Sequence, residues 1–288
     1  MVANELISAA AEAVSEEARD VKLTPVSGGD ICAAYLFDGK NRYFMKVHHC
    51  RKLLEAEAAG LQAIASVPSA PRVPEVFALV DGGDASALML EYIHPGRKQS
   101  ESLRNLGRAL ACMHREGRSR KFGFHQDNLI GKTPQINTWC DSWAEFFTRF
   151  RIAPLVSRAQ SQGLLKGGDL QLLEKLCLRL PDLLVEPAWG SLLHGDLWGG
   201  NYLISTDGEG VLIDPAVSYG HREADVAMTE LFGGFPQEFY HGYHSEFPLE
   251  DGYGQRKEIY NLYHLLNHLC MFGGGYLSSV TSIARRYA

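Results

Sequence analysis

The segments HGDLWGGN (residues 194–201) and IDP (residues 213–215) decide the fold. An aspartate followed five residues later by an asparagine, and then a hairpin ending in a second aspartate, is an arrangement used for phosphoryl transfer from ATP. Asp196 can accept the proton of an attacking hydroxyl, while the Asn201 amide oxygen and the Asp214 carboxylate are suitable Mg²⁺ ligands. The alternative is a polar hairpin in which these side chains only make turns. The spacing favours an ATP-dependent phosphotransferase.

A lysine lies upstream in an otherwise apolar alternating strand. Lys46 and Val47 point to opposite faces of that strand. Because a lysine among apolar side chains needs an anion, we expect Lys46 to bind ATP phosphates together with a helix carboxylate. Glu57 is the preferred partner and Glu55 is the competing candidate. The plain alternative is an edge lysine that reaches water.

Two further segments of the N-terminal part indicate nucleotide contacts. A glycine turn at residues 27–30 lies between two strands, although it is not a full GxGxxG motif and also fits a plain hairpin turn. The last strand before residue 94 ends in a segment whose backbone groups can meet adenine, although an ordinary amphipathic strand would look the same. The candidate nucleotide-binding residues here are Gly28, Gly29, Glu91, Tyr92 and Ile93.

The order of the patterns predicts two lobes. Residues 20–93 are rich in strands, with a turn at DGKN, a helix over 51–66 and a strand pair around Gly82 and Gly83. An amphipathic helix is expected over 4–19. Beyond residue 94 the patterns become helical, and helices are expected over residues 103–115, 141–159, 169–180 and 257–272. The prediction is an N-terminal ATP-binding lobe (1–93) and a C-terminal catalytic and acceptor-binding lobe (94–288).

Composition excludes several classes of protein. The 288 residues carry a net charge of −6, which argues against a nucleic-acid-binding surface, and 45% are hydrophobic, as in globular proteins. The six cysteines include no CxxC pair, as expected for reduced thiols in a cytoplasmic protein. The acidic N-terminus does not resemble a signal peptide, and no apolar run is long enough to cross a membrane.

Together these segments resemble the fructosamine kinase (ketosamine-3-kinase) family, within the aminoglycoside phosphotransferase-like branch of the protein-kinase-like fold. The resemblance covers nearly the full chain. The most specific similarity is in HGDLWGGN and DPAVSYGHREADVAM (214–228). The family is also similar in two other segments: Asn137-Thr138-Trp139 with the aromatic residues that follow, and IYNLYHLLNHLCMFGGGY (259–276). The fold class expected from this resemblance is α+β, with a small antiparallel-sheet lobe containing one helix and a larger, mostly helical lobe.

The resemblance implies ATP-dependent phosphorylation of a sugar hydroxyl, typically O3, of a small-molecule or protein-bound ketosamine such as fructosamine or ribulosamine. Asp196 would be the catalytic base, Asn201 and Asp214 the Mg²⁺ ligands, Lys46 and Glu57 an ion pair, and residues 91–93 the adenine-contacting hinge. Two alternatives stay open: another phosphotransferase of this fold, acting on an aminoglycoside, choline or homoserine, and a nucleotide-binding protein without catalysis. The oligomeric state is left open.

Four residues are candidates for the acceptor site. Trp198 is either a platform for the sugar or core packing. The others either line the acceptor pocket or form a structural loop, and they are Tyr219, His221 and Arg222. Asp225 is expected to fix the catalytic loop, and His194 to be structural. The glycine turn has Asp30 where some family members carry a redox-active cysteine, so Cys32 is interpreted as a small strand residue.

Overall fold

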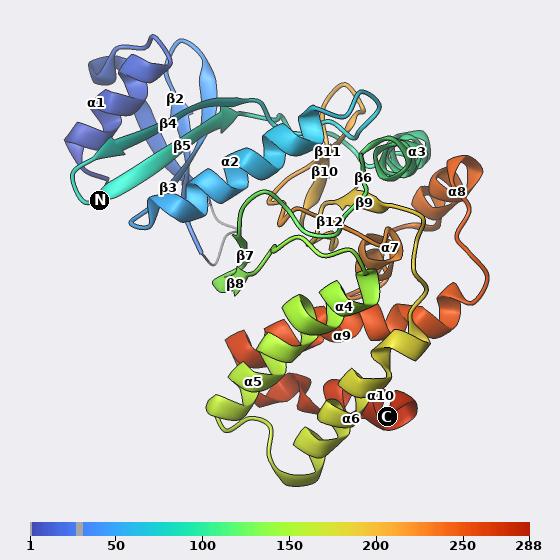
Figure 1. The fold of residues 1–288 in the computed structure, drawn as a ribbon. Coiled ribbons are helices and arrows are strands. Elements are labelled where there is room, and N and C mark those ends of the chain that lie inside the picture. The colour runs from blue at the N-terminus through green and yellow to red at the C-terminus, as the bar shows by residue number, and fades with distance from the viewer. Residues whose placement is uncertain (1, 27–30) are drawn as a thin grey trace.

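The N-terminal lobe is built on one antiparallel sheet (Figure 1). The structure is a computed structural model that describes residues 2–26 and 31–288. The strand order is β1-β2-β3-β5-β4. The strands are β1 (Lys22–Val26), β2 (Ala33–Asp38), β3 (Arg42–His48), β4 (Val76–Gly82) and β5 (Ala85–Glu91). The two expected hairpins are confirmed: β2 pairs with β3 across the DGKN turn, and β4 pairs with β5 across Gly83, whose φ is +66°.

Both faces of this sheet are covered by helices, because neighbouring strand residues point to opposite sides. α1 (Asn4–Ala13) packs on the face that carries Met45 and Met89. α2 (Arg51–Ala65) packs on the face that carries Leu88 and Leu90. The expected sheet lobe is confirmed, with α2 as the helix inserted between its strands and α1 as the expected N-terminal amphipathic helix, which packs on the other face of the sheet. α1 is also shorter than the predicted helix over 4–19, and a 3₁₀ turn, η1 (Ala18–Asp20), follows it.

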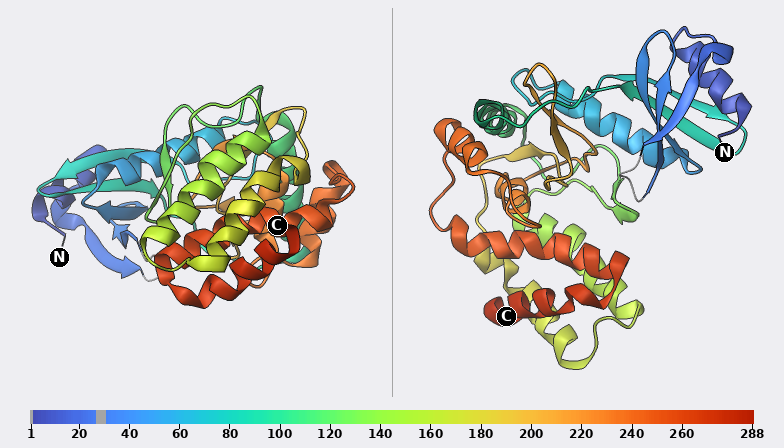
Figure 2. Two further views of the ribbon diagram at one scale, coloured as in Figure 1. Left: turned by 60° about the horizontal axis from the view of Figure 1, so that its bottom comes forward. Right: turned by 180° about the vertical axis from the view of Figure 1, so that it is seen from behind.

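α2 connects the sheet to the rest of the molecule. Figures 1 and 2 show it running from the sheet toward the C-terminal lobe. A Cβ added at Gly60 would lie 3.0 Å from Pro215 Cγ, so this helix lies directly against the segment after Asp214. The buried side chains of α2 share one hydrophobic cluster with those of the first C-terminal helix. α2 therefore fixes the position of the N-terminal lobe relative to the catalytic segments.

The C-terminal lobe is mostly helical and carries short strands. Residues 92–99 connect the lobes, and we place the lobe boundary at 93/94 in this connection. The helices are α3 (Ser100–Glu116), α4 (Trp143–Phe147), the π-helical η2 (Thr148–Ile152), α5 (Ala153–Ser161), α6 (Gly167–Leu183), α7 (Glu223–Thr229), α8 (Gln237–Glu246), α9 (Tyr253–Phe272), the 3₁₀ turn η3 (Gly274–Tyr276) and α10 (Leu277–Tyr287). The strands are β6 (Arg118–Ser119), β7 (Asn128–Ile130), β8 (Thr133–Gln135), β9 (Gly190–Leu193), β10 (Tyr202–Ile204), β11 (Gly210–Leu212) and β12 (Ser218–Gly220).

The short strands hold the two segments for which catalytic residues were predicted. They form the hairpins β7–β8 and β10–β11 and the three-stranded sheet β12-β9-β6. β9 leads into HGDLWGGN, and the β10–β11 hairpin joins that segment to Asp214. The helix expected over 141–159 is interrupted by the π turn, and α7, α8 and α10 were not predicted.

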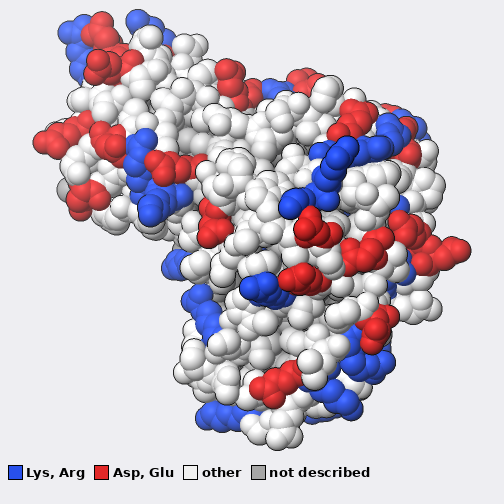
Figure 3. Space-filling model, in the orientation of Figure 1, with Lys and Arg blue, Asp and Glu red and all other residues white. Residues whose placement is uncertain are grey.

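The surface shows no single dominant charge on the face drawn in Figure 3, where acidic and basic side chains lie among one another. Within the described part of the chain, no helix is long and apolar enough to cross a membrane.

Candidate active site

The loop that carries Asp196 is held by backbone geometry that only glycine allows. Gly195 has a φ of +82°, and a Cβ there would lie 2.1 Å from the Ala216 carbonyl oxygen. In return, the Ala216 amide donates to the carbonyl of His194 at 2.8 Å. The catalytic loop and the segment after Asp214 are therefore fixed against each other.

Asp225, on α7, anchors the loop that carries Asp196 by accepting hydrogen bonds from its backbone. Its Oδ2 accepts the His194 amide at 2.7 Å, and its Oδ1 accepts the Gly195 amide at 2.9 Å. His114 Nε2 donates to Oδ2 at 3.2 Å, while its Nδ1 accepts from Tyr243 at 2.9 Å. Burial alone would raise the pKa of Asp225, but these hydrogen bonds and neighbouring histidines lower it. Asp225 is thus a buried, charged anchor, as expected.

His194 has a structural environment. Its Nε2 donates to the Ile213 carbonyl at 2.9 Å, and its Nδ1 accepts from the Asp196 amide at 3.3 Å. The side chain is fully buried, and burial lowers its pKa, so it stays neutral at pH 7. Both ring nitrogens are occupied by backbone groups. His194 therefore has no free nitrogen for proton transfer.

Asp196 and Asn201 form one hydrogen-bonded turn. Asn201 Nδ2 donates to the Asp196 carbonyl at 2.8 Å and to its Oδ2 at 3.1 Å. Burial, with the charge of Asp214, raises the pKa of Asp196 to about 7. A carboxylate with a pKa near the working pH is well suited to accept a proton from a hydroxyl.

Asp214 and Asn201 present oxygen atoms that fit a magnesium ion. Because Asn201 uses its nitrogen on Asp196, its Oδ1 has no protein partner within the described residues. Asp214 adopts a φ of +55°, a left-handed conformation that is rare for a residue other than glycine and is found at functional positions. One amide oxygen and one carboxylate match the few protein ligands that Mg²⁺ keeps when phosphates supply the rest.

Lys46 lies between the two lobes. Its Nζ donates to Glu57 Oε1 at 2.6 Å and also to Asp214 Oδ1. Burial alone would lower the pKa of Lys46, but the charges of Glu57 and Asp214 raise it, so the amine stays protonated. Glu55, the competing partner, instead pairs with Arg51 at 2.8 Å. The structure thus pairs Lys46 with Glu57.

We predict that Lys46→Ala raises the KM for ATP and lowers kcat, because it removes a largely buried cation that contacts the Asp214 carboxylate. The double variant with Glu57→Ala should cost far less than the sum of the single variants, since either change already breaks the pair. Steady-state kinetics in a double-mutant cycle measures this coupling. Glu55→Ala is the matched control, and strict additivity of Lys46→Ala with Glu57→Ala would contradict the pairing.

The predicted hinge has free backbone groups. β3 and β5 pair as far as Tyr43 and Glu91, and beyond that point the amides of Tyr92 and Ile93 donate to no backbone carbonyl in the described part of the chain. The Glu91 side chain accepts a hydrogen bond from Arg72, so we expect adenine to contact the backbone of this segment and not the Glu91 side chain. The predicted glycine turn, with Gly28 and Gly29, lies outside the described residues.

Two candidate acceptor residues reach the surface. Trp198 is 41% exposed, so it is not core packing. Its amide donates to the Asp196 carbonyl at 3.1 Å, so this segment is a tight turn. It is therefore not an extended loop, in which the side chains of residues 196 and 198 would point the same way. Tyr219 is half-buried and stacks on the exposed Trp139, with ring centroids 6.0 Å apart. Both aromatic rings remain candidates.

The other two candidates point into the protein interior. His221 is 1% exposed and packs among the rings of Trp143 and Tyr260. Arg222 is 6% exposed and donates to the carbonyls of Phe247 (3.0 Å) and Pro248 (2.6 Å). We correct their expected acceptor-pocket role to a structural one, because both side chains are used to pack the lobe.

Cys32 is half-buried just before β2. Burial, with the charge of Glu57, raises the pKa of its thiol to about 11. A thiol that stays protonated at pH 7 is a weak nucleophile. Cys32 was expected to be a small strand residue, but it lies one position before β2, where its half-buried thiol is a small residue at the start of the strand.

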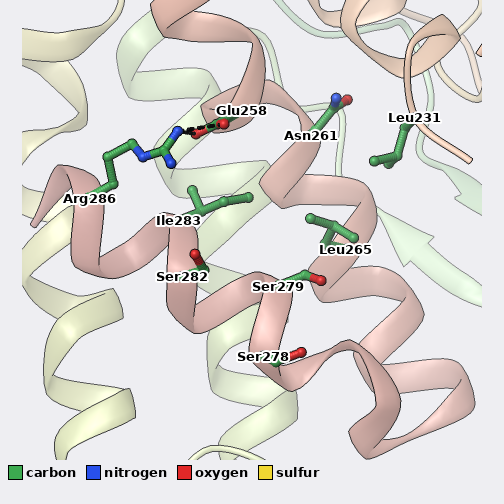
Figure 4. A pocket seen from close by; sticks show the side chains of 9 residues that line it. All are labelled: Leu231, Glu258, Asn261, Leu265, Ser278, Ser279, Ser282, Ile283 and Arg286. Carbon is green, nitrogen blue, oxygen red and sulfur yellow. Dashed lines mark hydrogen bonds and ion pairs between the residues drawn. The ribbon is translucent and has the colours of Figure 1, made fainter.

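A recess of about 360 Å³ lies between α9 and α10 (Figure 4). None of the predicted site residues that the structure describes lines it. Exposed serines form part of its wall, and its two charged groups, Glu258 and Arg286, neutralise each other at 2.6 Å. It therefore indicates no particular class of ligand.

Sequence reasoning missed the residues that support the loops. His114 lies 111 positions before Asp225. A lone histidine on an amphipathic helix does not indicate a hydrogen bond to a residue so far away in the sequence. Gln135 Nε2 donates to the Ala216 carbonyl at 3.0 Å, and Asn128 Nδ2 to the Val217 carbonyl at 2.8 Å. These contacts join segments far apart in the chain, so spacing alone could not predict them.

Comparison with known proteins finds relatives that match most of the chain. A sequence model described as fructosamine kinase matches residues 3–288. The chain is 45% identical over 254 residues to a protein of Synechocystis named "probable ketoamine kinase", covering 87% of this chain and 85% of that one. It is 38% identical over 284 residues to the chloroplastic protein-ribulosamine 3-kinase of Oryza sativa subsp. indica, covering 94% and 81%.

Solved structures share the whole architecture. A protein of Thermobifida fusca, named as a candidate fructosamine-3-kinase, has a TM-score of 0.87 at 32% identity, covering 99% of this chain and 98% of that one. An aminoglycoside phosphotransferase in complex with AMP-PNP and hygromycin B has a TM-score of 0.64 at 17% identity, covering 92% and 94%. The second likeness concerns the fold alone, which is the bilobal protein-kinase-like fold.

Proposed function

Because the chain belongs to the fructosamine kinase family, we propose that it transfers the γ-phosphoryl group of ATP to a sugar hydroxyl of a ketosamine, with Asp196 as the base. Membership of this family makes the chain an ATP-dependent kinase. We assign the reacting hydroxyl to O3, the position that appears in the names of the rice and Thermobifida proteins. The acceptor is a small-molecule or protein-bound ketosamine.

The observation that carries this proposal is the joint placement of Asp196, Asn201 and Asp214. Asn201 orients the Asp196 carboxylate at 3.1 Å, and Lys46 contacts Asp214 from the other lobe. Asp196 accepts the proton of the attacking hydroxyl, and Lys46 offsets phosphate charge. Asn201 and Asp214 would hold Mg²⁺, which when bound neutralises phosphate charge.

A phosphoryl-transfer screen with radiolabelled ATP tests the function. The panel contains a fructosamine, a ribulosamine, an aminoglycoside and choline, with and without Mg²⁺. We expect label on the ketosamines at O3, located by NMR of the product. Transfer to the aminoglycoside or choline but not to a ketosamine would replace the proposal with another phosphotransferase. No transfer to any acceptor would indicate nucleotide binding without catalysis.

We predict that Asn201→Ala and Asp214→Ala each raise the Mg²⁺ concentration for half-maximal activity by about tenfold, because each change removes an oxygen ligand. Activity titrated against Mg²⁺ at fixed ATP measures this effect. Asp207→Ala, which removes an exposed carboxylate from the nearby β10–β11 turn, is the control. Unchanged half-saturation in both variants would count against the metal roles.

We propose that Trp198 holds the sugar of the acceptor. The side chain lies in the turn between Asp196 and Asn201, and a Cβ added at Gly200 would lie 2.3 Å from its ring. The ring therefore covers Gly200 while 41% of the residue stays exposed. A large exposed aromatic face beside the base is suited to a sugar ring. Tyr219, stacked on Trp139, is the second aromatic candidate for the acceptor.

We predict that Trp198→Ala lowers kcat/KM for a fructosamine or ribulosamine by about ten- to a hundredfold, because losing the platform misplaces the reacting hydroxyl. The KM for ATP should change little. Steady-state kinetics and thermal unfolding are measured on the same preparation, with the exposed Phe77→Ala as the control. A lower melting temperature with normal acceptor kinetics would remove Trp198 from the site.

A further inference from the structure

A second cavity, of about 210 Å³, lies between the β7–β8 hairpin and the η2–α5 segment. Its walls are largely apolar and include Pro134, Phe150 and Leu155. Two arginines, Arg151 and Arg158, also line it. Two guanidinium groups in the wall of an apolar cavity are unusual, because a buried cation requires a compensating anion.

Arg151 carries a buried charge without an acidic partner. It is 4% exposed, and none of the described residues places a carboxylate within ion-pair distance of it. It donates to the carbonyls of Ile136 (2.6 Å) and Phe150 (3.1 Å) and to Asn137 Oδ1 (2.6 Å). These three bonds use three of its five N–H groups. Burial lowers its pKa to about 10, although the charges of Tyr263 and Asp127 act in the opposite direction.

The backbone around Arg151 is also unusual. Arg151 lies in the π-helical turn between α4 and α5, and such turns occur frequently at functional sites. The turn interrupts an otherwise continuous helix and places Arg151 in the interior of the lobe. Its guanidinium lies 4.5 Å from the Phe146 ring, a contact that stabilises the cation but supplies no negative charge.

Two further polar groups at the cavity lack partners. Thr133 is 4% exposed, lines the cavity, and its Oγ1 has no hydrogen-bond partner among the described residues. Arg158 is half-buried, and its side chain makes no ion pair or hydrogen bond in the same part of the chain. Leaving a buried hydroxyl without a partner is unfavourable, so a ligand that accepts its hydrogen bond is favoured.

We propose that this cavity binds the carboxylate of a small organic acid, with Arg158, Thr133 and the free N–H groups of Arg151 as donors. A planar carboxylate matches the fork of a guanidinium and needs only one compensating charge. The apolar walls fit an aliphatic body, whereas a phosphate dianion would lose more hydration in such a cavity. The carboxylate is either part of the acceptor or a separate molecule.

The cavity is connected to the catalytic segments. Tyr263 lines it and donates to Gln135 at 2.7 Å, and Gln135 donates in turn to the Ala216 carbonyl, two residues beyond Asp214. Burial raises the pKa of Tyr263, the charge of Arg151 opposes this increase, and the charge of Asp196 adds to it. Two hydrogen-bonded residues, Tyr263 and Gln135, therefore connect the cavity to the segment that follows Asp214.

The binding arm of the test uses valerate and its neutral isostere valeramide, measured by calorimetry on the full chain without nucleotide. We expect valerate to bind and valeramide to bind at least about tenfold more weakly, because only the anion pairs with guanidinium. Arg158→Gln should raise the Kd for valerate by about tenfold, and Thr133→Val by about three- to fivefold. Arg149→Gln, an exposed position in the same π turn, should leave the Kd unchanged.

Arg151 itself is left intact because it holds the carbonyls of Ile136 and Phe150, so its variants risk misfolding. Equal binding of valerate and valeramide, or an unchanged Kd in Arg158→Gln with a normal unfolding midpoint, would overturn the proposal. This arm needs no turnover. Its failure would therefore leave the proposed kinase function standing.

A second arm, which rests on the proposed function, identifies the source of the carboxylate. It compares fructosyl-glycine with its amide as acceptors. If the carboxylate belongs to the acceptor, the wild-type protein has a higher KM for the amide than for fructosyl-glycine, and Arg158→Gln abolishes this difference. Valerate then competes with the acceptor. If the carboxylate is a separate molecule, both acceptors have the same KM and valerate binds without competing. Either result supports the cavity as a carboxylate site.

Discussion

Asp196→Asn should lower kcat by about a hundred- to ten-thousandfold while leaving ATP affinity nearly unchanged, because a positioned base contributes about this much to catalysis. The change keeps the shape of the side chain and the contact with Asn201, which holds Asp196 at 3.1 Å. It removes the negative charge of the carboxylate and, with it, the capacity to accept a proton. Turnover is measured with a fructosamine acceptor, and ATP affinity by calorimetry on the same preparation.

The pH profile gives an independent check on the same residue. Because the pKa of Asp196 is raised to about 7, wild-type kcat/KM for the acceptor should fall as the pH falls through this value and the base becomes protonated. Since the charge of Asp214 contributes to the shift, bound Mg²⁺ should move this limb to lower pH. Turnover of Asp196→Asn within threefold of the wild type would remove Asp196 as the base.

Local patterns in the sequence predicted the N-terminal sheet and its hairpins, since DGKN and Gly83 are turn signals that act on neighbouring residues. α10 was missed although its signal was present: Val280, Ala284 and Tyr287 follow helical spacing. α7 gave no such signal, because all but one of its seven residues are buried and a helix buried on all sides has no amphipathic period.

The site was predictable where it depends on spacing within one segment. Asp196 and Asn201 lie in one turn, and Asp214 ends the next hairpin. Glu57 was preferred over Glu55, and helical spacing supports that preference, because Glu57 lies three residues after Leu54 and four before Leu61, both buried. His221 and Arg222 were misjudged because polar residues beside a catalytic loop can equally be fixed by distant segments, here α8 and α9.

Asp225→Asn should lower the free energy of unfolding by about 3–5 kcal/mol, the usual cost of breaking a buried charged network. Both carboxylate oxygens accept hydrogen bonds: Oδ1 from the Gly195 amide at 2.9 Å, and Oδ2 from the His194 amide at 2.7 Å and from His114. An asparagine offers one oxygen and one NH₂ group. Whichever way it turns, its NH₂ group faces a backbone N–H, and the loop must move.

The same variant should lower kcat, because the displaced amides belong to the two residues that precede Asp196. Urea unfolding and steady-state kinetics on Asp225→Asn separate the two effects, and His114→Gln tests the outer contact of the anchor. Asp84→Asn, at an exposed turn, is the control. A purely packing role for Asp225 predicts lower stability with normal kcat per folded molecule. An anchor that positions the base predicts that kcat stays low even at temperatures where the variant is fully folded, with little change in the KM for ATP.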